Sequence, residues 1–489
     1  MKTIITALSI AIASIVSTFA NNATITAVAT VGNTVTFNIA WANSWNAATA
    51  PNNWDAVWLF IKYQDCSTPT VWSHAKVVPG STVGAPLMVE DVTDSMGIFV
   101  RRSTAGAGNI AATAVTMQVN MPTGTYNIKV FGIEMVYAPA GNFEIGDNST
   151  SNKTFINTTV TAALQTSGIA ANAIQSAGGA GFTNVALPTT YPMGYNGFYC
   201  MKYEITQQQY VEMLNTLTYD QQTGCTFLAP NVSPLNYSMT GGSGASGSNG
   251  ISTDIVGVAS TTPAHYTNNC AIALPHNSTN DGQWNACNYL KWADLTAYLD
   301  WSALRPITEL EMEKVCRGFN GRVNGEFPWG NNTTNSNTTG AVGYTAVNTA
   351  GDAPVSVQNG PWAGSFSGLC QGAKRVGYAA QAASTRVTAG AAYFGAMDMA
   401  GNVWEQVVNT STAAGATFTA LHGNGVLLAN GNADVANWPN VTTGLGTGRK
   451  GSSCDVVTGG GIQISDRSAI NVPTPNRECG GGGRGGRTY

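Results

Sequence analysis

The sequence predicts an all-β domain over residues 21–133 followed by an α+β, loop-rich domain over residues 134–489. Three observations support this division. A chain of 489 residues is too long for one ordinary domain. Short β-rich runs fill the first part, whereas capping boxes mark helices in the second. Long Gly/Ser/Asn/Thr-rich stretches, over about 216–284 and 331–341, read as surface insertions in the second part.

Six β-rich runs, broken by Gly, Pro, Asn and Ser, predict the strands of the first domain: 23–31, 34–41, 56–63, 97–101, 114–119 and 125–131. Alternation is clearest where Val35, Phe37, Ile39 and Trp41 fall on one face. Strands at this spacing predict a small antiparallel sandwich. Nothing catalytic stands out here, so we expect a spacer or assembly role, with binding of a partner or glycan as the alternative.

Residues 1–20 have the pattern of a signal peptide, with Lys2 before an apolar run over 4–16 and the small-residue site Thr18-Phe19-Ala20. A membrane anchor is the alternative, but the run is shorter than the roughly 18 residues a spanning helix needs. We therefore expect a secreted protein at the cell surface or in the periplasm of a bacterium, with no membrane span.

Composition narrows the classes of partner. Only 10% of residues are charged and the net charge is −4, so no basic stripe exists to bind nucleic acid. Nine cysteines in an exported chain are expected to be mostly buried or bridged, and the odd number leaves at least one unpaired. The four histidines are isolated and no C-x-x-C occurs, which excludes a zinc site of the usual spacing.

Three helices are predicted in the second part. Capping boxes at Thr206–Gln209 and Thr308–Glu311 each start one, and apolar periodicity predicts a third over 292–301. Glu309, Glu311 and Glu313 fit a solvated helix start better than an acid–base site.

The segment from Asp398 to Glu405 is a candidate calcium site. Its two terminal carboxylates are hard oxygen ligands, and Gly401 and Asn402 allow a turn that exposes backbone carbonyls between them. The alternative is a tight turn beside a buried Trp404, with both carboxylates solvated or paired to arginine.

Five segments in the same order resemble the formylglycine-generating enzyme, or sulfatase-modifying factor, family: 135–146, 198–210, 292–311, 316–330 and 398–405. The last reproduces the signature D-M-A-G-N-V-W-E almost letter for letter. The resemblance runs from residue 134 to the C-terminus. It implies an irregular α+β fold related to C-type lectins. It also implies that Asp398, Gly401, Val403 and Glu405 bind calcium, the middle two through backbone oxygens.

Active members of this family bind Cu(I) through two cysteines in a C-x-x-x-x-C arrangement after an R-G-G-S turn. If residues 449–453 are that turn, Cys454 lies near the first position but Gly459 stands at the second. If residues 459–461 are the turn, the two positions fall on Ile464 and Ala469. Neither alignment gives two thiolates, so copper is not expected, and Cys454 is the candidate catalytic residue only if the chain is an oxidase. Arg467, Arg484 and Arg487 are expected to pair with carboxylates.

The sequence therefore favours a noncatalytic structural or binding protein that associates with itself or with other subunits, with a glycan as a further possible ligand. Two alternatives stay open. One is a copper-dependent oxidase that generates formylglycine in sulfatases, and the other is a calcium-dependent carbohydrate-binding module.

Overall fold

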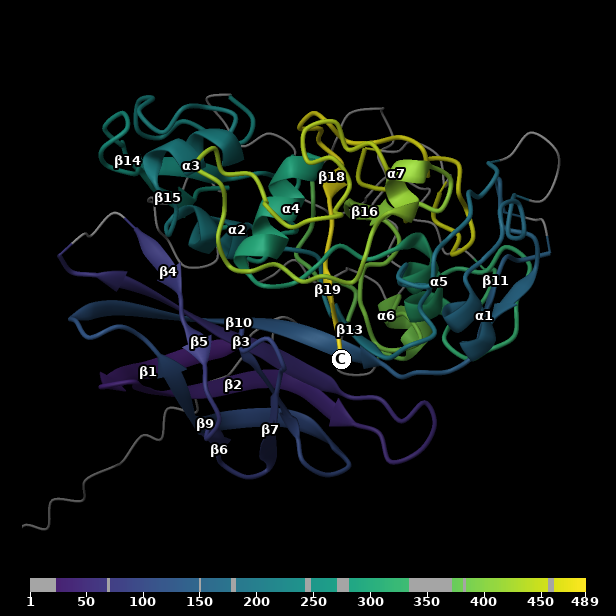
Figure 1. Cartoon of the computed structure of the whole chain (residues 1–489), viewed down its shortest axis with the longest axis horizontal. Coiled ribbons are helices and arrows are strands. Elements are labelled where there is room, and N and C mark those ends of the chain that lie inside the picture. Colours follow the sequence, from purple (N-terminus) through teal and green to yellow (C-terminus); the bar gives the residue numbers. More distant parts are fainter. Residues whose placement is uncertain are drawn as a thin grey trace, which may run out of the picture.

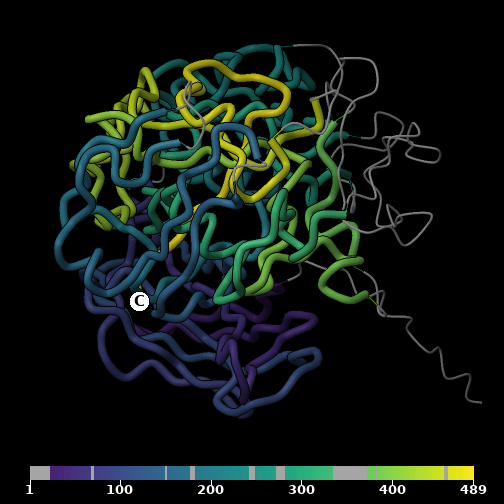
Figure 2. Tube along the Cα trace, turned by 90° about the vertical axis from the view of Figure 1, so that its right-hand side faces the viewer, coloured from purple at the N-terminus to yellow at the C-terminus, as the bar shows by residue number. Residues whose placement is uncertain are grey.

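The computed structural model describes residues 23–67, 71–148, 151–176, 182–241, 248–270, 281–333, 372–380, 384–455 and 461–489. Strands from the first 138 residues form the lower level of the molecule in Figure 1, coloured purple to blue. Most of the helices and shorter strands lie above them. Figure 2 gives the same two levels from the side, with the C-terminus at the height where they meet.

A five-stranded sheet forms the outer layer of the lower level. Its order is β1 (Thr24–Val31), β2 (Thr34–Asn46), β9 (Gly106–Asn120) and β5 (Lys76–Val77), and β6 (Thr82–Val83) also pairs with β9. β1 and β9 are both antiparallel to β2. β1 is an edge strand, and seven of its eight residues are exposed.

A seven-stranded sheet joins the two parts of the chain. Its order is β19 (Gly486–Thr488), β13 (Phe198–Met201), β10 (Tyr126–Ala138), β3 (Asp55–Asp65), β8 (Ile98–Arg102) and β7 (Leu87–Asp91), and β4 (Trp72–His74) pairs with β3. β10 pairs with β3 from Tyr126 to Val136 and with β13 from Met135 to Ala138. The boundary placed at residues 133/134 from the sequence falls inside this continuous strand.

β3 is buried on both of its faces. Val57, Leu59 and Ile61 pack into a cluster shared with the five-stranded sheet, including Val35 and Phe37 of β2. The alternate residues of β3 pack instead into the main core of the upper level. Trp58, one of them, donates its indole N–H to the carbonyl of Ser302 at 2.9 Å. Alternation along one strand therefore places one apolar layer on each side of the sheet.

The upper level is rich in loops and holds short elements. Its helices are α1 (Ala162–Ser167), α2 (Gln207–Leu214), α3 (Tyr219–Cys225), α4 (Trp292–Trp301), α5 (Glu309–Arg317), α6 (Arg386–Ala389) and α7 (Ala413–Ala416). Two hairpins pair β11 (Phe143–Ile145) with β12 (Thr158–Val160) and β14 (Ile251–Ile255) with β15 (His265–Asn268). A three-stranded sheet has the order β17 (Thr447–Lys450), β16 (Trp404–Val408), β18 (Gly481–Gly482). The whole is a mixed, sheet-rich and loop-rich structure with few helices.

The three helices expected from the sequence are present. Both capping boxes form, with the hydroxyls of Thr206 and Thr308 accepting from the backbone three residues on. The third helix, α4, spans residues 292–301 as predicted.

The expectation that α5 begins in solvent is wrong. Glu309, Glu311 and Glu313 are at most 2% exposed. Each forms an ion pair with an arginine, Arg467, Arg305 and Arg317 respectively. Loops distant in the sequence cover the helix on all sides, so its charges are satisfied by partners that its local pattern does not reveal.

The predicted insertion over 216–284 contains α3 and the β14–β15 hairpin, and Ile251 and Tyr266 of that hairpin are buried in the main core. Of the second predicted insertion, 331–341, only residues 331–333 are described. The predicted signal peptide, residues 1–20, lies outside the described residues. Within the described ranges, no helix is long and apolar enough to cross a membrane.

Candidate metal and thiol site

The turn from Asp398 to Val403 brings the two sites expected from the sequence together. Asp398, Gly401 and Asn402 all have positive φ, which folds the chain sharply before β16 begins at Trp404. The turn packs against the residues after β17. Gly401 donates its N–H to the carbonyl of Gly451 at 2.6 Å, and Cys454 donates its N–H to the carbonyl of Asn402 at 2.8 Å.

Asp398 and Glu405 each have one satisfied and one unsatisfied carboxylate oxygen. Asp398 Oδ2 accepts from the N–H of Gly377 at 2.5 Å, and Glu405 Oε1 accepts from Arg484 Nε at 2.5 Å. The other oxygens, Asp398 Oδ1 and Glu405 Oε2, are buried without a hydrogen-bond partner in the structure. Buried carboxylate oxygens normally have donors or a cation beside them.

Glu204 is a third buried carboxylate at this site, and the sequence analysis did not select it. Its Oε1 accepts from the N–H of Val403 at 3.1 Å, and its Oε2 accepts from Asn402 Nδ2 at 2.5 Å. These two hydrogen bonds attach the turn at Asn402 and Val403 to the segment that follows β13. Its place directly after β13, in the segment Lys202-Tyr203-Glu204-Ile205-Thr206 quoted for the family resemblance, is the signal that could have identified it.

The electrostatics of the site disfavour three ionised carboxylates. Burial raises the pKa of Glu204 well above its usual range, and Asp398 and Glu405 raise it further. Burial also raises the pKa of Asp398 and of Glu405, against the lowering effect of Arg484. Arg484 forms an ion pair with Glu405, and its other donors go to backbone carbonyls.

Calcium fits this donor set. The described residues hold no group of three Asp, Glu, His or Cys side chains close enough to share a metal ion, so a cation here needs backbone oxygens beside the two carboxylates. That is the mixture the resemblance implies for Gly401 and Val403. Calcium accepts such mixed oxygen sets, and it would satisfy Asp398 Oδ1 and Glu405 Oε2.

Cys454 is buried at 1% exposure. Its sulfur lies 4.0 Å from the carbonyl oxygen of Cys479. Burial raises the pKa of the Cys454 thiol, and with smaller contributions from Asp455 and Glu204 the pKa reaches about 12. A thiol with a raised pKa is a poor source of the thiolate that binds a soft metal.

A second copper-binding cysteine does not appear beside it among the described residues. Position 459 lies outside them, and its residue is glycine. In the other alignment, Ile464 packs into an apolar cluster. Cys479 is disulfide-bonded and so is not a thiolate. The cysteines that the structure describes around Cys454 therefore do not fit a two-thiolate copper site.

A comparison with protein-family models shows which family the chain belongs to. Residues 129–474 match the model of the sulfatase-modifying factor enzyme 1-like domain, which is well over half of the chain. The chain belongs to the sulfatase-modifying factor enzyme 1-like family. No curated protein matches it. The family match begins inside β10, the strand shared by the two levels of the fold.

The three arginines expected to pair with carboxylates in this family member do so. Arg467 pairs with Glu309, Arg484 with Glu405, and Arg487 with Asp94. The last pair joins the C-terminal strand β19 to the loop between β7 and β8, so it links the family domain to the N-terminal strands. Arg487 also lies over the ring of Trp58, with its guanidinium carbon 4.3 Å from the ring centroid.

Proposed function

We propose that this member of the family is a noncatalytic structural or binding protein and that its enzyme-like domain no longer oxidises cysteine. The observation that carries the proposal is the state of the thiols. Cys454 is buried with a raised pKa, and the nearby Cys479 is held in a disulfide. Copper activates dioxygen in active relatives through a pair of thiolates. Here position 459 is a glycine, and Cys479, the cysteine that the described structure places near Cys454, is in a disulfide.

A Cu(I) competition titration against a chromophoric chelator tests this proposal. The parent protein and a Cys454→Ser variant are expected to compete equally weakly. A stoichiometric, tight site that disappears in Cys454→Ser would contradict the proposal and favour the copper-dependent oxidase.

We also propose that calcium stabilises the turn at Asp398 and Glu405, with Gly401 and Val403 contributing backbone oxygens. The two buried, unpartnered carboxylate oxygens support this site. Bound calcium would supply positive charge where three carboxylates are gathered around Arg484. Its role would be to hold the turn in place before β16 and against residues 451–454. Gly401 and Asn402 are joined to those residues by backbone hydrogen bonds.

We propose an exported, surface or periplasmic location and association with further copies of the chain or with other subunits. The signal-peptide pattern supports export, although residues 1–20 lie outside the described part. Two features support association. β1 lies at the edge of its sheet, and seven of its eight residues are exposed, which is the position from which strands pair with another chain. In addition, many of the charged side chains among the described residues are buried in ion pairs, which leaves less charge on that part of the surface to keep copies apart.

A further inference from the structure

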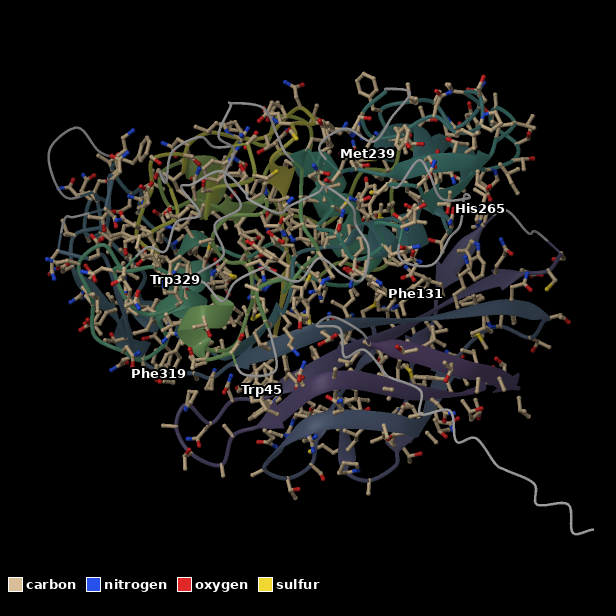
Figure 3. All side chains as sticks on the ribbon, turned by 180° about the vertical axis from the view of Figure 1, so that it is seen from behind. Trp45, Phe131, Met239, His265, Phe319 and Trp329 are labelled. Carbon is tan, nitrogen blue, oxygen red and sulfur yellow. The ribbon has the colours of Figure 1, made fainter. Side chains whose placement is uncertain are left out.

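A cavity of about 670 Å³ lies where the N-terminal strands meet the family domain. One wall is formed by the end of β2 and the loop that follows it, through Asn43, Trp45 and Asn53. Those residues lie outside the region that matches the family. The opposite wall is formed by Arg386 and Ala389 of α6, by residues 391–395 and by Met397. In Figure 3, Trp45 lies at the level where the N-terminal strands meet the rest of the chain.

Aromatic rings and small residues shape the cavity. Trp45, Tyr203, Tyr393 and Phe394 line it. The Trp45 ring rests on the backbone of Gly395, where an added Cβ would lie 2.6 Å from Trp45 Cζ2. Tyr393 packs edge-on against Phe394, with ring centroids 5.0 Å apart. The rings are therefore held rigidly, and the alanines between them leave the space open. The lining alanines are Ala380, Ala389, Ala391 and Ala392.

The two cations that line the cavity are already engaged. Lys202 Nζ lies 3.0 Å from Glu134 Oε2 and 3.4 Å from Asp55 Oδ2, and it also lies over the rings of Trp45 and Tyr203. Arg386 donates to the carbonyls of Ala391, Cys316 and Pro328. An anionic ligand would have to compete with two carboxylates for Lys202. A cationic ligand would be repelled by the positive charges of Lys202 and Arg386, which both line the cavity.

We propose that this cavity binds an uncharged sugar, as the terminal unit of a glycan. The half-buried rings of Trp45 and Tyr393 offer apolar surface to the C–H faces of a pyranose ring. The amide of Asn43 and the hydroxyl of Ser384 offer hydrogen bonds to its hydroxyl groups, as does the Asn53 amide, whose Nδ2 also donates to the carbonyl of Phe394 at 2.9 Å. The volume is within the range of small-ligand sites. This inference rests on the proposed binding role and names its ligand class. It makes the sugar site independent of the carboxylates at Asp398 and Glu405.

The site has direct consequences for its variants. Ala391→Trp places a large side chain in the cavity and removes no existing side-chain hydrogen bond, so it is expected to abolish binding. Trp45→Ala removes one stacking face and is expected to weaken binding about tenfold. Ala163→Trp is the matched control, because Ala163 is exposed on α1 and distant from the cavity lining.

Saturation-transfer difference NMR on the full mature chain tests the proposal. The probes are cellobiose, maltose, lactose and N,N′-diacetylchitobiose, with sialyllactose and N-acetyltyrosine amide for comparison. Thermal melting of each variant establishes that it is folded. We expect saturable transfer to at least one neutral disaccharide, preserved in Ala163→Trp and lost in Ala391→Trp. The same transfer is expected with chelator present.

Three results would overturn the proposal. The first is saturation transfer to none of the neutral disaccharides, and the second is transfer that persists in folded Ala391→Trp. The third is binding of only N-acetyltyrosine amide or sialyllactose that Ala391→Trp abolishes. These readouts are separate from the copper titration. If the protein binds neither the neutral sugars nor copper tightly, only the sugar as ligand class is refuted, and the noncatalytic role stands. A tight copper site in a chain that still binds sugar refutes the noncatalytic role alone.

Discussion

Glu405 and Arg484 form a buried ion pair, with Glu405 Oε1 2.5 Å from Arg484 Nε, while Glu405 Oε2 has no hydrogen-bond partner among the described residues. The pair therefore satisfies half of the carboxylate. Asp398 is in the same condition, with its Oδ1 unpartnered. These two buried oxygens beside one turn are the basis of the calcium site proposed above.

Calcium is expected to raise the midpoint of thermal unfolding. A ligand that binds only the folded state adds about 2.7 kcal/mol at a concentration 100 times its dissociation constant. Asp398→Asn should lose this response, because it removes one charged ligand. Asp91→Asn is the control, since Asp91 is exposed on β7. Differential scanning calorimetry with calcium and with chelator measures the effect, and equal midpoints for the parent protein would rule the site out.

The pH dependence of stability should also depend on calcium. Burial raises the folded-state pKa values of Glu204, Asp398 and Glu405 above their unfolded values. The folded state then binds more protons than the unfolded state, so without calcium stability falls as pH rises above about 4 toward the raised pKa values. Calcium binds the ionised carboxylates and should flatten this fall. Urea titrations across pH with calcium and with chelator test this, and parallel curves would contradict it.

Breaking the pair between Glu309 and Arg467 should be severe. Both side chains are 0% exposed and Nε lies 2.8 Å from Oε2. Glu309→Gln leaves a buried guanidinium without its countercharge, and we expect a loss of about 3–5 kcal/mol. Glu144→Gln is the matched control, because Glu144 pairs with Arg322 at the surface and should change stability by less than about 1 kcal/mol. Denaturant unfolding compares them, and equal losses would refute the distinction.

Association through β1 predicts an effect of charge on that edge. Val28 and Val31 of β1 are 42% and 81% exposed. The double variant Val28→Lys/Val31→Lys should shift the mature chain toward the monomer, because lysine blocks edge pairing. Val258→Lys is the control, at 59% exposure in a distant loop. Sedimentation velocity on the whole chain is the appropriate measurement, since a truncation at residue 134 would cut β10. A parent protein that is monomeric at every concentration would exclude this association.

Local pattern predicted the regular elements because their signals lie within a few residues. The alternation from Val35 to Trp41 placed β2, and the hydroxyl and amide of the Thr206 capping box placed α2. Burial by distant segments was not predictable in this way. The burial of Glu309 could not be predicted because its partner Arg467 lies 158 residues away. The role of Glu204 could not be predicted because its partner Asn402 lies 198 residues away. The sequence also could not reveal that β10 is shared by both parts, since strand pairing is a tertiary property.

The most direct test of the noncatalytic role is conversion of a sulfatase-type cysteine peptide by the protein reconstituted with Cu(I) under air. Mass spectrometry of the peptide reads the result, with an active member of the family as the positive control. We expect the cysteine to stay unchanged, because Cys479, whose carbonyl lies near the Cys454 sulfur, is disulfide-bonded and position 459 is a glycine. Formation of the aldehyde by the parent protein, and its loss in Cys454→Ser, would contradict the account.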